Sequence, residues 1–291
     1  MALDLWVEFF EDLQFVRGRS QNTVMAYRRD LELFDKYMDS HTDLSGIYEF
    51  MSHKGLSPRS QARMISSIRT YYRFCGAQGQ SIPDLRKLKQ PKIKAALPKA
   101  VALKDFERLY EACMVESPFA TARNQITLLL LFGLGCRVTE LIELNLSDFN
   151  ETEGWLSVTG KGEKQRLIPL TQHLLNELRD YLKHVRPHLV KEGLSDQSIL
   201  LNDRHRRPSR VDIWRWLANW SSLAGYEEPL SPHKFRHGCA TALLEGGADL
   251  RSIQMLLGHS SIQTTQIYTS VSNQKMKAAV ESSHPLSHLK D

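Results

Sequence analysis

The sequence contains no apolar run long enough to cross a membrane. Its longest is "ITLLLLFGLGC" at 126–136, well short of the roughly 18 to 20 residues that a spanning helix needs. The stretch "MALDLWVEFF" at 1–10 also lacks the basic residues that begin a secretory signal. We therefore expect a cytoplasmic protein with no membrane partner.

Cysteine is scarce and scattered. The four cysteines stand at positions 75, 113, 136 and 239, and none forms a CxxC pair. This spacing argues against a disulfide scaffold and against a zinc knuckle. Buried thiols are the expected role for all four.

Motifs for metals and nucleotides are incomplete. His233 and His237 have the spacing of an HExxH zinc site, but the glutamate is missing and Lys234 and Arg236 stand between them. The carboxylate cluster that a two-metal nuclease needs is also lacking. The glycine-containing "GKGEK" at 160–164 departs from the phosphate-binding G-x-x-x-x-G-K-[ST] pattern. We expect no metal, no nucleotide and no other cofactor.

Positive charge, by contrast, is concentrated in one part of the chain. The formal net charge is only +5 over 291 residues, yet residues 54–94 hold ten Lys or Arg and a single acid, Asp84. Such a segment suits a polyanionic partner, although a solvated basic surface would have the same composition.

The first ninety residues have the pattern of helices. Apolar residues recur every three or four positions at 3–15 and at 23–38, and a third helix follows "LSP" and runs to about residue 75. In that third helix the two kinds of side chain fall on opposite faces. The apolar face holds Ile65, Ile68, Tyr71, Tyr72 and Cys75, and the basic face holds Arg59, Arg63, Arg69 and Arg73. Because four like charges repel, the helix tolerates them more readily if phosphates neutralise them.

The second part of the chain is mostly helical but includes a short β-hairpin. A lysine-rich, proline-bracketed stretch, "PDLRKLKQPKIKAALP" at 83–98, predicts an interdomain linker. Helices are expected near 103–115, 120–134 and 138–144. The runs "WLSVTG" and "QRLIPL", joined by "KGEK", predict two antiparallel strands, and "SILLN" is a candidate for a third. Helices resume from about 172, interrupted by the basic loop "DRHRRPSR" at 203–210. The expected fold class is mainly α with a small antiparallel sheet.

Four motifs contain side chains that can bind phosphate, act as a nucleophile or transfer protons. They are "GLGCRVTELIEL" (133–144), "GKGEKQR" (160–166), "HKFRH" (233–237) and "LLGHSSIQTTQIY" (256–268). Two arginines can hold a phosphodiester through paired hydrogen bonds and stabilise the charge of a pentacoordinate transition state. A tyrosine hydroxyl, with an ordinary pKa near ~10, can attack phosphorus if its proton is removed. A lysine or a histidine can protonate the leaving sugar oxygen.

These motifs resemble those of the tyrosine recombinase (phage integrase) family, and specifically of its Xer type. The stretch "SPHKFRHGCATALLEGGADLRSIQMLLGHSSIQTTQIYTSV" at 231–271 is similar almost throughout to the H-x-x-R…LLGH…TTQIY segment of that family. "GCRVTELIEL" resembles the motif that carries the first family arginine. The resemblance extends over nearly the whole chain.

The resemblance implies a role for each motif residue. It assigns Arg137 and Arg236 to the scissile phosphate and Tyr268 to nucleophilic attack through a 3′-phosphotyrosyl intermediate. Glu140 is implied to orient Arg137, since it stands three residues further on.

The remaining motif residues are implied to move protons or to bind phosphate. Lys161 corresponds to the general acid on the 5′ oxygen, His233 to a histidine that accepts or relays a proton, and His259 to one that hydrogen-bonds the phosphate. Lys164 and Arg166 are expected to contact DNA backbone phosphates.

The resemblance also implies domains and partners. Residues 1–90 correspond to a SAM-like, core-binding DNA-binding domain, 91–98 to a basic linker, and 99–291 to the catalytic domain with a C-terminal tail helix. Four protomers, either identical or paired with a related recombinase, are expected on double-stranded DNA with a dif-like site, passing through a Holliday junction. Tail exchange between neighbours, and activation by a DNA translocase such as FtsK, belong to the same expectation.

Chromosome-dimer resolution is the favoured role. A mobile-element integrase would use the same chemistry, and a type IB topoisomerase would share it. A binding-only architectural DNA protein would have the same fold but form no covalent adduct.

Overall fold

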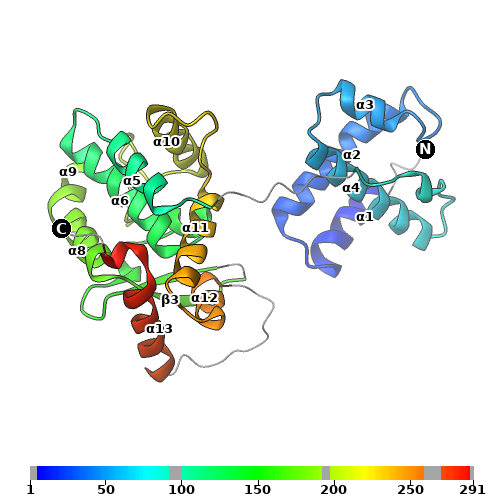
Figure 1. The fold of residues 1–291 in the computed structure, drawn as a ribbon. Coiled ribbons are helices and arrows are strands. Elements are labelled where there is room, and N and C mark those ends of the chain that lie inside the picture. Colours follow the sequence, from blue (N-terminus) through cyan, green and yellow to red (C-terminus); the bar gives the residue numbers. More distant parts are fainter. Residues whose placement is uncertain (1–4, 92–99, 161, 192–196, 259–269, 289–291) are drawn as a thin grey trace. The chain divides into compact units, whose positions relative to one another are not determined.

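The computed structural model describes residues 5–91, 100–160, 162–191, 197–258 and 270–288. The chain divides into two compact units, Met1–Leu97 and Pro98–Asp291. Figure 1 shows the elements of each unit. None of the helices in the described ranges combines the length and the apolar composition that crossing a bilayer needs.

The first unit is a small helical bundle. Its elements are α1 (Trp6–Glu11), a π-helical turn (Asp12–Val16), α2 (Gln21–Met38), α3 (Ile47–His53), α4 (Pro58–Ala77) and a 3-10 turn (Leu85–Lys87). The two long helices begin at serine caps, because the Ser20 and Ser57 hydroxyls accept hydrogen bonds from backbone N–H groups in the first turn.

The core of this unit is rich in aromatic rings. The rings of Phe9 and Tyr71 pack edge to face with their centroids 5.1 Å apart, and those of Phe34 and Tyr72 do so at 5.9 Å. The apolar face predicted for α4 is confirmed: Ile65, Ile68, Tyr71, Tyr72 and Cys75 are all buried. The opposite face of α4 is therefore the one that can meet a ligand.

The second unit is larger and surrounds a long apolar helix. Its first half comprises α5 (Leu103–Ala112), α6 (Pro118–Leu134), α7 (Val138–Ile142), a 3-10 turn (Leu146–Asp148), β1 (Phe149–Asn150), β2 (Trp155–Thr159) and β3 (Gln165–Pro169). Its second half comprises α8 (Gln172–Asp180), a π-helical turn (Tyr181–Val185), α9 (Arg186–Leu189), α10 (Arg210–Leu223), α11 (Pro232–Glu245), α12 (Leu250–Leu257), α13 (Ser270–Ser283) and a 3-10 turn (Pro285–His288).

Helix α6 forms the centre of this unit. Ser117 caps its N-terminus, Pro118 occupies its first turn, and every residue from Ile126 to Leu134 is buried. Gly135 ends the helix with a left-handed φ of 54°. Three of the four cysteines lie in the core of this unit and Cys75 in that of the first, so the expectation of buried thiols is confirmed.

The predicted hairpin is confirmed and extended by one short strand. Strands β2 and β3 pair antiparallel with Leu156 opposite Ile168, and β1 pairs with β2 on the other side. The "SILLN" segment forms no strand with the sheet; it contributes one isolated bridge, between Ser198 and Asn145. Its apolar residues Ile199, Leu200 and Leu201 are instead buried in the core, which explains why their sequence has the composition of a strand.

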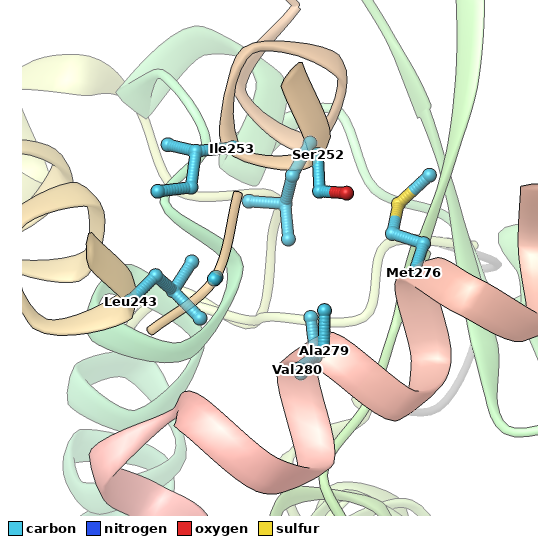
Figure 2. Close-up of a pocket in the computed structure, with 8 residues that line it drawn as sticks. Leu243, Ser252, Ile253, Met276, Ala279 and Val280 are labelled. Atoms are coloured by element: carbon cyan, nitrogen blue, oxygen red, sulfur yellow. The ribbon is translucent and has the colours of Figure 1, made fainter. Parts of the chain in front are cut away.

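The C-terminal segment packs on the unit to which it belongs. His284 and Leu286 are completely buried, and a Cβ atom at Gly246 would lie 2.3 Å from the Ser283 carbonyl oxygen, so only glycine permits this approach. A small, partly open pocket remains where α13 meets α11 and α12 (Figure 2). It is lined mainly by Leu243, Ile253, Met276, Ala279 and Val280, with the Ser252 hydroxyl at one side, which is the lining of a packing defect rather than of a polar ligand site.

Candidate active site

Arg137 stands immediately before α7 and is held there by Glu140. One Glu140 oxygen, Oε2, accepts the Arg137 backbone N–H at 2.8 Å, and the other, Oε1, accepts Nη1 of the guanidinium at 2.7 Å. The Glu140 side chain is 3% exposed, whereas that of Arg137 is 45% exposed. The guanidinium is thus fixed on one side and open to an anion from solvent on the other.

The environment of Glu140 keeps this carboxylate ionised. Burial raises the pKa of Glu140, but hydrogen bonds from Arg166 and from Arg137 outweigh it, and the pKa lies below its ordinary value. A charged Glu140 is what the two arginines require, because a neutral carboxyl would accept their hydrogen bonds more weakly.

Arg166, on β3, lies inside the protein instead of on its surface. Its Nη2 donates to Glu140 Oε2 at 2.7 Å, and its Nε donates to the Leu256 carbonyl at 2.7 Å. Only 6% of its side chain is exposed. The sequence-based expectation was a backbone-phosphate contact; in the structure the guanidinium bonds to these two internal partners. Lys164, two residues earlier, is exposed.

Arg236 comes to the same place from α11. Its Nη1 donates to the Gly135 carbonyl at 2.8 Å and its Nη2 to the Leu257 carbonyl at 2.6 Å. Burial first, and then the nearby charge of Arg137, lower the pKa of this arginine. Arginine nevertheless remains protonated in proteins. Three guanidiniums against one carboxylate leave this cluster of Arg137, Glu140, Arg166 and Arg236 with an excess of positive charge, which suits a phosphate.

His233 and His237 are exposed on α11, one of them a turn before Arg236 and the other next to it. Within the described residues, no group of three or more His, Cys, Asp or Glu side chains is arranged to hold a metal ion. The structure therefore brings together Arg137, Glu140 and Arg236 from the predicted set and places His233 on the same helix as Arg236.

The other three residues predicted for catalysis, Lys161, His259 and Tyr268, lie outside the described residues. The positions that border them are described. Gly160 N–H donates to the Lys164 carbonyl at 2.8 Å. Gly258, with a φ of 67°, ends α12 directly before His259.

The basic face of α4 is less uniform than its sequence suggests. Arg59 and Arg73 are exposed. Arg63 donates two hydrogen bonds of 2.9 Å to the carboxylate of Asp30, a buried residue of α2. Arg69 is half-buried. Part of the charge of Arg63 is thus balanced within the unit.

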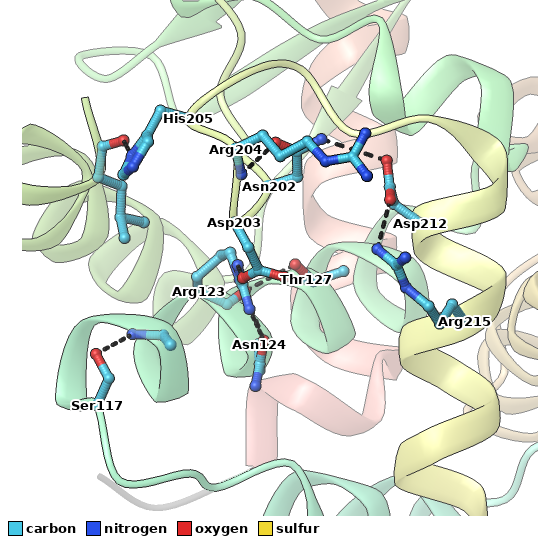
Figure 3. Close-up of polar contacts among 12 residues, drawn as sticks. Ser117, Arg123, Asn124, Thr127, Asn202, Asp203, Arg204, His205, Asp212 and Arg215 are labelled. Carbon is cyan, nitrogen blue, oxygen red and sulfur yellow. Dashed lines mark hydrogen bonds and ion pairs between the residues drawn. The ribbon is translucent and has the colours of Figure 1, made fainter. Parts of the chain in front are cut away.

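The basic loop before α10 has an internal framework that the sequence did not reveal (Figure 3). The Asn202 side-chain oxygen accepts the backbone N–H groups of Arg204 and Arg206 at 3.0 and 3.2 Å, and Asp203 pairs with the buried Arg123 of α6. Arg123 also lies over the Trp216 ring at 4.5 Å.

Within the same loop, Arg207 turns inward, because its guanidinium donates to the Ile142 carbonyl and to Asn145, both at 2.6 Å. Arg204, Arg206 and Arg210 remain exposed. Arg123, three residues before the apolar run of α6, was the available signal, but the sequence does not identify its partner 80 positions away.

Comparisons with known proteins agree with this geometry. Residues 99–275 match the phage integrase family, and residues 7–79 match the phage integrase N-terminal SAM-like domain. The tyrosine recombinase XerD of Listeria innocua is 37% identical over 97% of this chain and 99% of its own.

Solved structures show the same fold. Lambda integrase bound to DNA matches with a TM-score of 0.68 at 17% identity, covering 100% of this chain and 99% of that one. XerH site-specific recombinase bound to a palindromic difH substrate matches with a TM-score of 0.67 at 20% identity, covering 95% and 84%.

Proposed function

Because this chain belongs to the phage integrase family, the tyrosine recombinases, we propose that it cuts and rejoins duplex DNA at one specific site through a covalent 3′-phosphotyrosyl intermediate. The observation that carries the proposal is the cluster of Arg137, Glu140, Arg166 and Arg236, in which a single buried carboxylate orients an outward-facing guanidinium. This arrangement can bind a phosphodiester and stabilise its extra charge in the transition state without a metal ion.

In the proposed reaction Arg137 and Arg236 hold the scissile phosphate, and the Tyr268 hydroxyl attacks phosphorus. The bond from phosphorus to the 5′ oxygen breaks, and Lys161 supplies the proton that this oxygen takes up. His233 accepts or relays the tyrosine proton, and His259 hydrogen-bonds the phosphate. Attack by a 5′ hydroxyl on the phosphotyrosine reverses the chemistry and rejoins the strand.

We assign DNA binding to both units. In the first, the SAM-like unit expected at 1–90, the basic face of α4 meets backbone phosphates. In the second, Lys164 and the exposed arginines of the loop before α10 do so, and the basic linker expected at 91–98 connects the two. Affinity that comes from phosphates is sequence-independent and falls steeply with salt.

The biological role that we propose is resolution of chromosome dimers at a dif-like site in the cytoplasm, because curated relatives similar over nearly the full chain are named XerD. Four protomers would act on two duplexes, alone or with a related recombinase, and a translocase such as FtsK would activate them. Tail exchange between neighbours would require α13 and the 3-10 turn after it to leave the positions that they occupy on their own unit.

A nicked suicide duplex carrying the host's dif-like sequence tests the proposal. After denaturation, the wild-type protein should carry a covalently attached strand, and Tyr268→Phe should bind the duplex but carry none. A protein without the adduct would be an architectural DNA-binding protein, and an adduct that persists in Tyr268→Phe would identify another nucleophile.

Arginine variants test the phosphate site. Arg137→Ala and Arg236→Ala should each slow adduct formation by about 100-fold or more with a smaller loss of DNA binding, since the charge that they meet develops in the transition state. Arg179→Ala is the matched control, because this partly exposed arginine of α8 pairs with Glu151 in a different part of the unit. Equal losses of cleavage and of binding would make the two arginines simple binding residues.

A further inference from the structure

Arg166 connects three separate segments of the second unit. It belongs to β3, its Nη2 reaches the Glu140 carboxylate on α7, and its Nε reaches the Leu256 carbonyl at the end of α12. Each of these segments lies close in sequence to a residue of the proposed site: β3 begins four residues after Lys161, α7 begins directly after Arg137, and α12 ends two residues before His259.

The end of α12 is held by two arginines at successive carbonyls. Arg166 donates to the Leu256 carbonyl and Arg236 to the Leu257 carbonyl. The last carbonyls of a helix have no partner within the helix and carry partial negative charge, so guanidiniums satisfy them well. Gly258 follows, and a Cβ atom there would lie only 3.1 Å from Nη1 of Arg166. The guanidinium therefore packs directly against the backbone that leads to His259.

Glu140 depends on Arg166 for its second partner. The carboxylate is 3% exposed and lies between Arg137 and Arg166. Removing one cation from a buried ion pair leaves the other charge without compensation, and a carboxyl in that position gains a proton more readily. Protonated Glu140 would hold Arg137 less firmly.

We propose that Arg166 is a positioning residue for strand cleavage: by fixing Glu140 and the end of α12 together, it sets the orientation of Arg137 and Arg236 toward the scissile phosphate. It does not itself contact DNA. The inference rests on the proposed function, because it concerns the same site, but it also makes a statement about Arg137 in the protein without DNA.

Three variants separate positioning from general stability. Arg166→Met removes both hydrogen bonds, and Arg166→Lys keeps one positive charge near Glu140. Arg186→Met is the matched control, because Arg186 is another buried arginine of this unit and donates to a backbone carbonyl, that of Ser198, at 2.9 Å. Thermal unfolding shows which variants are folded. If Arg166→Met does not fold, Arg166→Lys is used to test the proposal.

The first measurement is the rate of adduct formation at saturating suicide duplex as a function of pH. Arg166→Met should be slower than wild type by about tenfold to 100-fold, the loss typical of a group that orients a catalytic side chain. The ratio of the variant rate to the wild-type rate should fall further in weakly acidic buffer, where Glu140 takes up a proton. Arg166→Lys should show less of this fall, and the double variant Glu140→Gln with Arg166→Met should show none.

The same experiment can overturn the inference. Arg166 would be a phosphate contact if Arg166→Met cleaves saturating duplex at the wild-type rate and the salt slope of its DNA binding is lower by about one unit. A rate loss that is the same at every pH, or that Arg186→Met reproduces, would reduce Arg166 to a structural role.

The second measurement needs no DNA. The side-chain N–H signals of Arg137 in arginine-labelled protein should be protected from exchange in wild type and in Arg186→Met, and should lose that protection in Arg166→Met. Wild type that forms no adduct would contradict the proposed function, whereas unchanged Arg137 signals in Arg166→Met would contradict the inference about Arg166. The two failures are therefore distinguishable.

Discussion

Glu140 accepts two hydrogen bonds from Arg137, one on each carboxylate oxygen. The backbone N–H lies 2.8 Å from Oε2 and the guanidinium Nη1 lies 2.7 Å from Oε1. A single side chain therefore caps the start of α7 and aims the arginine that precedes it. The start of α7 and the position of the Arg137 guanidinium, which is proposed to bind phosphate, both depend on this one ionised carboxylate.

Replacing Glu140 with Gln should remove a defined part of the acid sensitivity of the fold. The pKa of Glu140 is lowered in the folded protein, so its carboxylate contributes stability that is complete above the ordinary value of 4.5 and is lost as pH falls through the lowered pKa. We expect Glu140→Gln to be less stable than wild type at about pH 7 and closer to it at about pH 3. Denaturant unfolding over this range, followed by tryptophan fluorescence, measures the difference. A stability gap that does not narrow in acid would contradict the prediction.

His284 should produce a second acid transition in a different pH window. It is completely buried beside Cys239 and Phe132, and burial lowers the pKa of its imidazole from 6.5 to about 4. The unfolded chain then binds a proton first, so stability is complete above about 6.5 and falls as pH drops toward about 4, by about 3 kcal/mol in all. In His284→Gln the free energy of unfolding should change much less between these pH values. His237→Gln, which replaces an exposed histidine of α11, should lose stability between these pH values as wild type does. If both variants lose equally little stability there, His284 is not the source of the pH dependence.

The sequence predicts well whatever depends on local periodicity. The face of α4 that holds Ile65 and Ile68 follows from their spacing, and the antiparallel pairing of β2 and β3 follows from two short apolar runs around a glycine turn. The resemblance to the family also identified Arg137, Glu140 and Arg236, which the structure places together. Their catalytic roles, like those of Lys161, His233, His259 and Tyr268, remain predictions.

Partners that are distant in sequence could not be predicted. Arg63 meets Asp30 from 33 positions away, and nothing in either helix alone specifies that contact. For Arg166 a local signal did exist: alternation along β3 puts it on the same face as Ile168, which is buried. The charge of Arg166 favours a position on the surface, whereas strand alternation favours one in the interior. The structure places the side chain in the interior, where Glu140 and the Leu256 carbonyl accept hydrogen bonds from its guanidinium.

The arginines of α4 should separate into two classes. Arg59→Gln and Arg73→Gln should each lower the salt slope of DNA binding by about one unit and leave stability unchanged, because both side chains are exposed. Arg63→Gln should also destabilise the first unit, by about 1 to 3 kcal/mol, because Asp30 loses two hydrogen bonds.

Salt titrations of DNA binding, together with denaturant unfolding, distinguish the two classes. Adding Asp30→Asn to Arg63→Gln should restore part of the lost stability by removing the uncompensated buried charge. If Arg63→Gln is as stable as Arg59→Gln, the pair with Asp30 contributes nothing to stability and Arg63 belongs to the same class as Arg59 and Arg73.

Gly258→Ala should damage cleavage more than a glycine substitution of similar backbone cost elsewhere. Gly258 has a φ of 67°, which costs a non-glycine residue about 1 to 2 kcal/mol, and its added Cβ would lie 3.1 to 3.3 Å from three atoms of Arg166. Gly247→Ala is the matched control in the same unit, because Gly247 has a φ of 90° but no atom within 4 Å of the added Cβ. Both variants should lose stability. Only Gly258→Ala should also slow adduct formation at saturating DNA, since Arg166 must move by a few tenths of an ångström to accommodate the methyl group. Equal rates in the two variants would mean that the contact between Gly258 and Arg166 has no influence on the phosphate site.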